Sequence, residues 1–141
     1  MLNNNVVKEM VGRLDKLSEL LASTEKMTIY HGFKAGRPMP FDAAESQLVQ
    51  INRICSDIRK ELAQQQNETP SNIENLITMY INRLLENTRF LSEVTEKLKQ
   101  QANGGKKYGF FKFRSDTKEW DRSTKKLLNV RSNLELFMRN A

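Results

Sequence analysis

Apolar residues recur at spacings of three and four in four segments of the chain, with polar residues between them. This period places the apolar side chains along one face of a helix, and strand-like alternation is absent from all four segments. We therefore predict helices near 4–23, 43–65, 72–102 and 117–139. The four predicted stripes are Val7, Met10, Leu14, Leu17 and Leu21; Ala44, Leu48, Ile51, Cys55, Ile58 and Leu62; Ile77, Tyr80, Leu84, Asn87, Leu91, Val94 and Leu98; and Trp120, Ser123, Leu127, Val130, Leu134 and Phe137.

Residues that favour helix ends lie beside these stripes. A side chain that can accept a hydrogen bond from a first-turn N–H, followed three positions later by Glu, is a typical helix start. Gly104 and Gly105 follow the third stripe, where a left-handed C-terminal cap favours glycine. The predicted start pairs are Asp42 with Glu45, Ser71 with Glu74, and Asp116 with Glu119.

The lengths of the connections predict how the helices are arranged. The connection near 66–71 is short, which favours antiparallel neighbours. The connections at 25–41 and 103–115 are longer than those usual in bundles, and long loops often carry function. We expect one domain, residues 1–141, forming an all-α, antiparallel up-down four-helix bundle with both long loops at one end.

Composition narrows the class of protein. Hydrophobic residues make up 38% and charged residues 28% of the chain, which is typical of a globular protein. The single cysteine rules out an internal disulfide and favours a reducing compartment. The N-terminal residues lack the apolar run of a signal peptide, and no segment approaches the about 20 apolar residues that span a bilayer. We expect a soluble, cytoplasmic protein with no membrane contact.

The positive charge is concentrated in the two long loops. Residues 25–41 carry a net charge of +2 and residues 103–115 carry +4, which together equal the +6 of the whole chain. Most of the aromatic residues outside the stripes lie in the same two loops. This pattern predicts an electrically neutral bundle with one basic, aromatic end, which suits an acidic partner.

The stretch "KKYGFFKF", residues 106–113, resembles part of the aromatic octamer of RNA-recognition motifs. Lys106, Tyr108, Gly109, Phe110 and Phe113 fit that pattern. The fold of that family is not predicted, because the preceding residues form a helix and leave no room for its four-stranded sheet. Two interpretations of the stretch remain open. It forms a short strand that pairs with 28–33 in a hairpin-like unit and packs on the bundle, or its basic side contacts a partner.

We predict a non-enzymatic binding module whose basic, aromatic end engages a polyanion, most plausibly nucleic acid. Lysine and arginine would contact phosphates, and Tyr108 or Phe111 would stack on a base. The alternative is a helical adaptor, assembly subunit or secretion-type chaperone that binds an acidic protein surface, a partner helix or a second copy. That alternative depends on apolar residues beside the second and third stripes, namely Val49, Ile54, Leu76, Met79, Ile81, Leu85 and Phe90. The predicted binding residues are Lys106, Lys107, Tyr108, Phe111, Lys112, Arg114, Lys34 and Arg37.

Catalytic and metal chemistry receive no support from the sequence. His31 and Cys55 are each the only residue of their type, whereas the usual zinc site needs several such ligands. No phosphate-binding glycine loop and no paired catalytic carboxylates are evident, so we expect no cofactor, no metal and no small-molecule substrate. Asn87, the polar residue of the third stripe, either fixes register inside the bundle or faces water.

Overall fold

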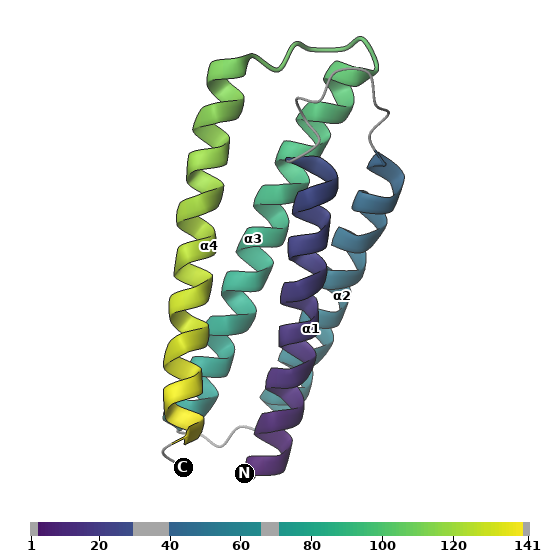
Figure 1. The fold of residues 1–141 in the computed structure, drawn as a ribbon. Coiled ribbons are helices and arrows are strands. Elements are labelled where there is room, and N and C mark those ends of the chain that lie inside the picture. Colours follow the sequence, from purple (N-terminus) through teal and green to yellow (C-terminus); the bar gives the residue numbers. More distant parts are fainter. Residues whose placement is uncertain (1–2, 30–39, 66–70, 140–141) are drawn as a thin grey trace.

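The computed structural model describes residues 3–29, 40–65 and 71–139, and these form four α-helices. They are α1 (Asn4–Thr28), α2 (Phe41–Gln65), α3 (Asn72–Ala102) and α4 (Phe110–Arg139). The predicted all-α bundle is confirmed, and the described part of the chain contains no strand. In Figure 1 the chain rises through α1, descends through α2, rises through α3 and descends through α4. The start of α1 and the end of α4 therefore lie at the same end of the molecule.

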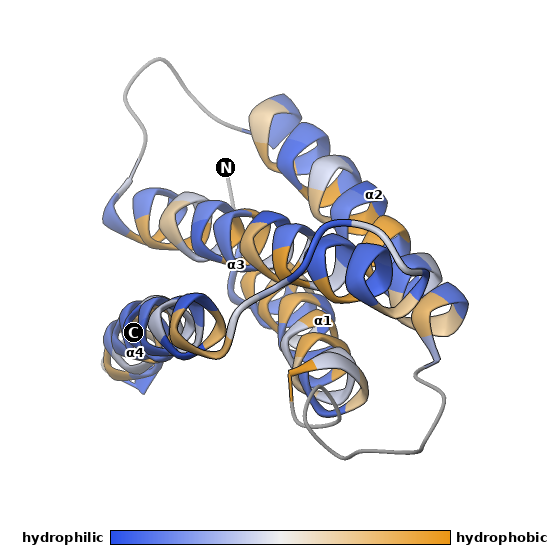
Figure 2. Ribbon diagram, turned by 90° about the horizontal axis from the view of Figure 1, so that it is seen from above, coloured by the Kyte–Doolittle hydropathy of each residue, from blue (hydrophilic) through white to orange (hydrophobic). Residues whose placement is uncertain are grey.

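The longest helix, α3, lies at the centre of the bundle. It packs against each of the other three helices, and α1 also packs against α2. Among the described residues the backbone of α4 comes close only to α3. Seen end-on in Figure 2, α2 and α4 lie on opposite sides of α3. The outward face of α4 is therefore covered by no other described helix.

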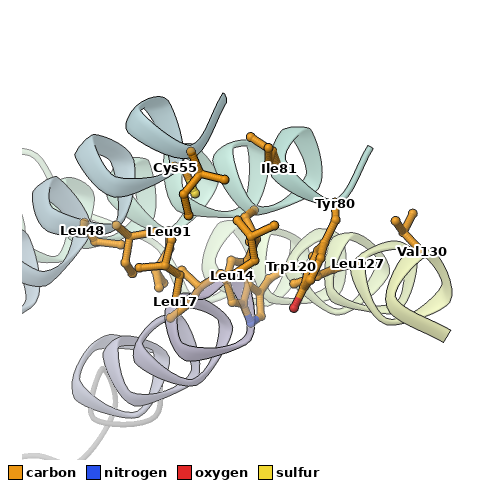
Figure 3. Close-up of a cluster of buried hydrophobic side chains, with 14 of the residues drawn as sticks. Leu14, Leu17, Leu48, Cys55, Tyr80, Ile81, Leu91, Trp120, Leu127 and Val130 are labelled. Carbon is orange, nitrogen blue, oxygen red and sulfur yellow. The ribbon is translucent and has the colours of Figure 1, made fainter. Parts of the chain in front are cut away.

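One hydrophobic core joins all four helices. Leu14 and Leu17 of α1 lie near Leu91 of α3, and Trp120 and Leu127 of α4 continue the same cluster (Figure 3). The buried positions follow the predicted stripes closely, since apolar burial is what stabilises these amphipathic helices. Two members of the last stripe are exceptions: Ser123 is half-buried and Phe137 is exposed.

Side chains also join α4 to α1. The Arg131 guanidinium donates hydrogen bonds to both carboxylate oxygens of Asp15, at 2.8 and 2.9 Å. The Tyr80 hydroxyl of α3 donates to the same carboxylate at 2.7 Å. Bidentate geometry of this kind is among the stronger polar contacts in proteins. The cluster therefore holds the C-terminal half of α4 against α1 and α3.

The first helix extends five residues beyond its predicted end at residue 23. Thr24 and Thr28 are buried, although both are polar. Each hydroxyl donates to a helix carbonyl four residues earlier, at 2.9 Å, which satisfies the hydroxyl inside the core. The predicted loop 25–41 therefore begins later than expected. The spacing of hydrophobic residues did not indicate that these two threonines are buried, because threonine was treated as polar.

The predicted ends of α3 are correct. Ser71 and Glu74 form a reciprocal capping box at its start. At its end Gly104 has φ +78°, and the N–H groups of Gly104 and Gly105 donate to Gln101 and Gln100 carbonyls at 3.1 and 2.7 Å. This is the Schellman arrangement, which requires a left-handed residue and favours glycine there.

The predicted capping roles of Asp42 and Asp116 are wrong, and α4 begins earlier than predicted. The helix α2 begins at Phe41, so Asp42 lies in its first turn instead of capping it. The helix α4 begins at Phe110, seven residues before the predicted start, and Asp116 lies inside it. Buried Phe113 and Asp116 continue the stripe that Trp120 was expected to open. Residues 110–115 are thus helical, which excludes the strand alternative for them.

Candidate polyanion-binding surface

The connection between α3 and α4 presents two lysines to solvent. Lys106 and Lys107 follow the glycine cap directly, and both are exposed. The backbone N–H of Tyr108 donates to the Gln101 side chain at 2.6 Å, which ties the connection back to α3. A Cβ on Gly105 would lie 2.8 Å from the Gln100 carbonyl oxygen, so glycine lets the chain turn closely over the end of α3. The cap therefore fixes where the two lysines emerge.

Tyr108 does not present its ring to a partner, contrary to the prediction. Its side chain is buried, and its hydroxyl donates to Asp116 at 2.5 Å. The ring packs edge-on against Phe113 at 5.6 Å between centroids, and the Lys97 ammonium lies 5.6 Å from its centre. Burial and the hydrogen bond to Asp116 raise the pKa of the hydroxyl. Tyr108 therefore holds the connection against α3 and α4. Its buried ring is not available to stack on a base.

Asp116 is the centre of a buried polar cluster at the start of α4. It accepts from Tyr108 and from Lys97, the latter at 3.1 Å, and Lys112 lies 3.3 Å away. Burial alone would raise the pKa of this carboxyl, but the Tyr108 hydroxyl, Lys97 and Lys112 together lower it. Lys112, which was predicted to bind phosphate, thus also has a partner inside the protein, because its ammonium neutralises this buried carboxylate.

Two phenylalanines begin α4 and face solvent. Phe111 is 83% exposed and Phe110 is 58% exposed, whereas Phe113, which lies across the helix from Phe111, is buried. The rings of Phe110 and Phe111 meet edge-on at 5.8 Å. Large apolar side chains this exposed at a helix start do not stabilise the fold by burial, so they call for another explanation. The predicted role of Phe111 as an exposed aromatic is compatible with this position.

Arg114 lies one turn further along α4 and is exposed, as are Lys106 and Lys107. None of these three cations takes part in an ion pair within the described residues. We call Lys106, Lys107, Phe110, Phe111 and Arg114 the basic end. The other two predicted contacts, Lys34 and Arg37, lie outside the described residues, as do Tyr30, His31 and Phe33.

The positive charge extends further along α4 than the predicted basic loop at 103–115. Residues 106–126 contain eight Lys and Arg against three acids, and the rest of the chain is nearly balanced, with fifteen against fourteen. Lys118, Arg122 and Lys125 are exposed on the outward face of α4. Their helical spacing from Arg114 was visible in the sequence, but such runs usually form an ordinary solvated face.

The apolar residues that suggested a protein partner are mostly covered. Ile81 is fully buried, and Ile54, Leu76, Leu85 and Phe90 pack against the core. Val49 and Met79 remain exposed, at 68% and 46%. Val49 lines a groove of about 900 Å³ between α2 and α3, whose other lining residues are mainly polar or charged.

Among the described residues no three His, Cys, Asp or Glu side chains gather where they would hold a metal ion. Cys55 is buried, and desolvation raises the pKa of its thiol to about 11, so this sulfur is protonated at neutral pH. No described helix combines the length and apolar character needed to cross a bilayer. The chain matches no protein-family profile, no curated protein and no solved structure.

Proposed function

We propose that the protein is a non-enzymatic nucleic-acid-binding module that acts through the basic end. The observation that carries the proposal is the strong exposure of Phe111, which lies within four residues of Lys107 and Arg114 along the chain. These two cations make no ion pair within the described residues. An exposed aromatic ring can stack on a base and contributes about 1–3 kcal/mol per base. The neighbouring cations can neutralise phosphates and release counterions. A cytoplasmic location would suit this role.

The proposal also includes the finer arrangement expected from the sequence. In an antiparallel up-down order, Lys34 and Arg37 would emerge at the same end as Lys106 and Lys107 and add to its charge. A pairing of 28–33 with the α3–α4 connection is not part of the proposal, because α4 already begins at Phe110. Tyr108 is not part of it either, and Lys112 contributes only as far as Asp116 leaves its ammonium available.

The test is a salt titration of binding to fluorescein-labelled oligothymidylate, followed by fluorescence anisotropy. The three cations of the basic end, neutralising about three phosphates of a single strand, should by themselves contribute about −2 to the slope of log K against log salt. The triple variant K106E/K107E/R114E should abolish binding, and F111S should weaken it. Lys112 is left unchanged, because an acid at that position would face the buried Asp116 carboxylate and disturb the fold.

The matched control is K8E/K16E/K60E, which makes the same charge change on exposed residues of α1 and α2. It should retain most of the affinity, and circular dichroism should show both triple variants folded. Absence of binding by the unmodified protein at low salt, or equal losses in the two triple variants, would remove the proposal. Repeating the titration with RNA and duplex DNA decides the nucleic acid preferred.

A second candidate function, a helical protein-interaction adaptor, is favoured by one separate observation. Leu128 and Leu136 lie eight residues apart on the outward side of α4, and each is 57% exposed. Together they offer an apolar strip to a partner helix or to a second copy of the chain. Sedimentation equilibrium tests self-association: a dimer that L128S/L136S converts to a monomer would support this function. If the unmodified protein and L128S/L136S are both monomers at all concentrations, binding of a second copy through this strip is excluded.

A further inference from the structure

The outward face of α4 continues the basic end for several turns. Lys118, Arg122 and Lys125 follow Arg114 at spacings of four, four and three, and all are exposed. The residues that α4 buries, among them Phe113, Trp120 and Leu127, lie on its other side. Since no other described helix covers the outward face, these cations form one line. We call Lys118, Arg122 and Lys125 the α4 stripe.

Two of the three acids of this region reduce the positive charge of the stripe, and the third is buried. Asp116 is buried and is already bound by Lys97 and Tyr108. Glu119 pairs with Arg122 at 2.5 Å, which reduces the charge that Arg122 offers a ligand. Asp121 is exposed and makes no ion pair within the described residues. Lys118 and Lys125 are therefore the main cations of the stripe, with Asp121 as the acid beside them.

We infer that a single-stranded nucleic acid lies along the outward face of α4, from the stacking ring of Phe111 to Lys125. This inference rests on the proposed function and extends its site by the α4 stripe. At 1.5 Å per residue, Phe111 and Lys125 are about 21 Å apart along the helix. That distance spans about six phosphates at the 3.4 Å axial rise per nucleotide of one strand in B-DNA, and fewer where the strand is more extended.

The exposed phenylalanines favour a single strand over a duplex. Stacking on Phe111 requires a base with an open face, and inside a duplex both faces of each base are covered by its neighbours. An unpaired strand offers such a face at every nucleotide. A line of cations that begins at an aromatic ring is the combination by which single strands are bound without sequence preference.

The experiment measures affinities for oligothymidylates of about four, eight and twelve nucleotides, chosen to bracket the expected site. The affinity should rise from the shortest to the middle length and change little beyond it. The variant K118E/K125E should weaken binding of the middle length about tenfold and make the salt slope shallower by about 1.4, at about 0.7 per phosphate contact. It should leave binding of the shortest strand nearly unchanged.

Two further variants make the result specific. K8E/K16E makes the same charge change on exposed residues of α1 and should not alter affinity. D121N removes the acid beside the stripe and should strengthen binding severalfold. Such a gain cannot result from a damaged fold, so failure of D121N to strengthen binding would count against the stripe.

The outcomes separate this inference from the proposed function. If K106E/K107E/R114E abolishes binding while K118E/K125E has no effect, the basic end binds and the track along α4 is wrong. If duplex DNA of equal length binds as tightly as the single strand, the single-strand assignment is wrong. If the unmodified protein binds no oligonucleotide at low salt, both fail. Weakening by K118E/K125E, strengthening by D121N and preference for the single strand together support the inference.

Discussion

Asn87 offers the sharpest test of how the interface between α3 and α4 is built. Its side chain is fully buried, its Oδ1 accepts a hydrogen bond from the Ser123 hydroxyl, and its Nδ2 has no partner among the described residues. A buried donor without a partner costs about 1–3 kcal/mol. The informative change is the double substitution Asn87→Leu with Ser123→Ala. It removes the unpaired Nδ2 of Asn87, and it also removes both members of the hydrogen bond between Oδ1 and the Ser123 hydroxyl.

The expected magnitude follows from these contacts. The double variant should gain about 1 kcal/mol in free energy of unfolding, because the larger leucine occupies part of the space that the serine hydroxyl leaves and tight packing limits the gain. For a chain of this length the midpoint of thermal unfolding should rise by about 4 °C. Ser123→Ala alone should lose about 1–3 kcal/mol, since Oδ1 then also lacks a partner inside the protein.

Urea denaturation gives the free energies, followed by helical circular dichroism and by the fluorescence of Trp120. That side chain is the only tryptophan, is buried, and stacks on Phe90 in the same interface. Thr124→Val provides an independent check, because the Thr124 hydroxyl is also buried and has no partner within the described part of the chain. Its removal should raise the free energy of unfolding by about 1 kcal/mol. Thr117→Val is its control, because that hydroxyl donates to the Phe113 carbonyl at 2.9 Å and its loss should not stabilise.

A double variant less stable than the unmodified protein by more than about 1 kcal/mol would refute this reasoning. Asn87 would then have a partner in solution, and the register role considered from the sequence would gain support. A change in oligomeric state of the double variant, measured by sedimentation, would point the same way.

Four substitutions and one labelling experiment test the cap, the polar cluster and the buried thiol. Gly104→Ala should cost about 1–2 kcal/mol from backbone strain alone, since φ is +78° and its Cβ would meet nothing within 4 Å; an unchanged urea midpoint would contradict this. Gly105→Ala should cost more than Gly104→Ala, because its Cβ would contact the Gln100 carbonyl. Tyr108→Phe should lower stability by about 1.5–3 kcal/mol through loss of a hydrogen bond to a charged group. Folding lowers the pKa of Asp116, so its contribution is present above the unfolded pKa of about 4 and is lost as pH falls through the folded value. The unfolding midpoint of D116N should therefore vary less than that of the unmodified protein between neutral pH and pH below about 4, and equal slopes would be the contrary result. Cys55 should react with a thiol reagent only as the protein unfolds, because burial keeps its pKa at about 11; rapid labelling of the native protein would disagree.

Hydrophobic spacing predicted four helices and nearly all of the core, because burial of one face is what these helices share. The Ser71 and Glu74 cap and the glycines at 104–105 were also readable, since their hydrogen bonds are local in sequence. The first turns of α4 could not be predicted from the sequence. Asp116 has the spacing of a cap with Glu119, but in the fold its partners are Tyr108 and Lys97, and a pairing across two helices has no sequence period.

The candidate site was predicted in part. Four of the predicted binding residues are exposed, and none of them belongs to an apolar stripe. They are Lys106, Lys107, Phe111 and Arg114. Tyr108 was misjudged because alternation of aromatics in a short run is compatible with a strand or a helix start, and only the tertiary contact with Asp116 decides between them. The α4 stripe was missed because exposed cations at helical spacing give the same sequence pattern whether or not they bind a ligand.

The central position of α3 has a consequence for the order in which the protein is made. Among the described residues, every pair of helices whose backbones pack closely includes α3, except α1 with α2, and α3 is third along the chain. During synthesis the first two helices must therefore wait, with their apolar faces only partly covered, until residues 72–102 have left the ribosome. The helix α4, which carries Arg114 and the α4 stripe, is synthesised last and packs onto helices that are already assembled.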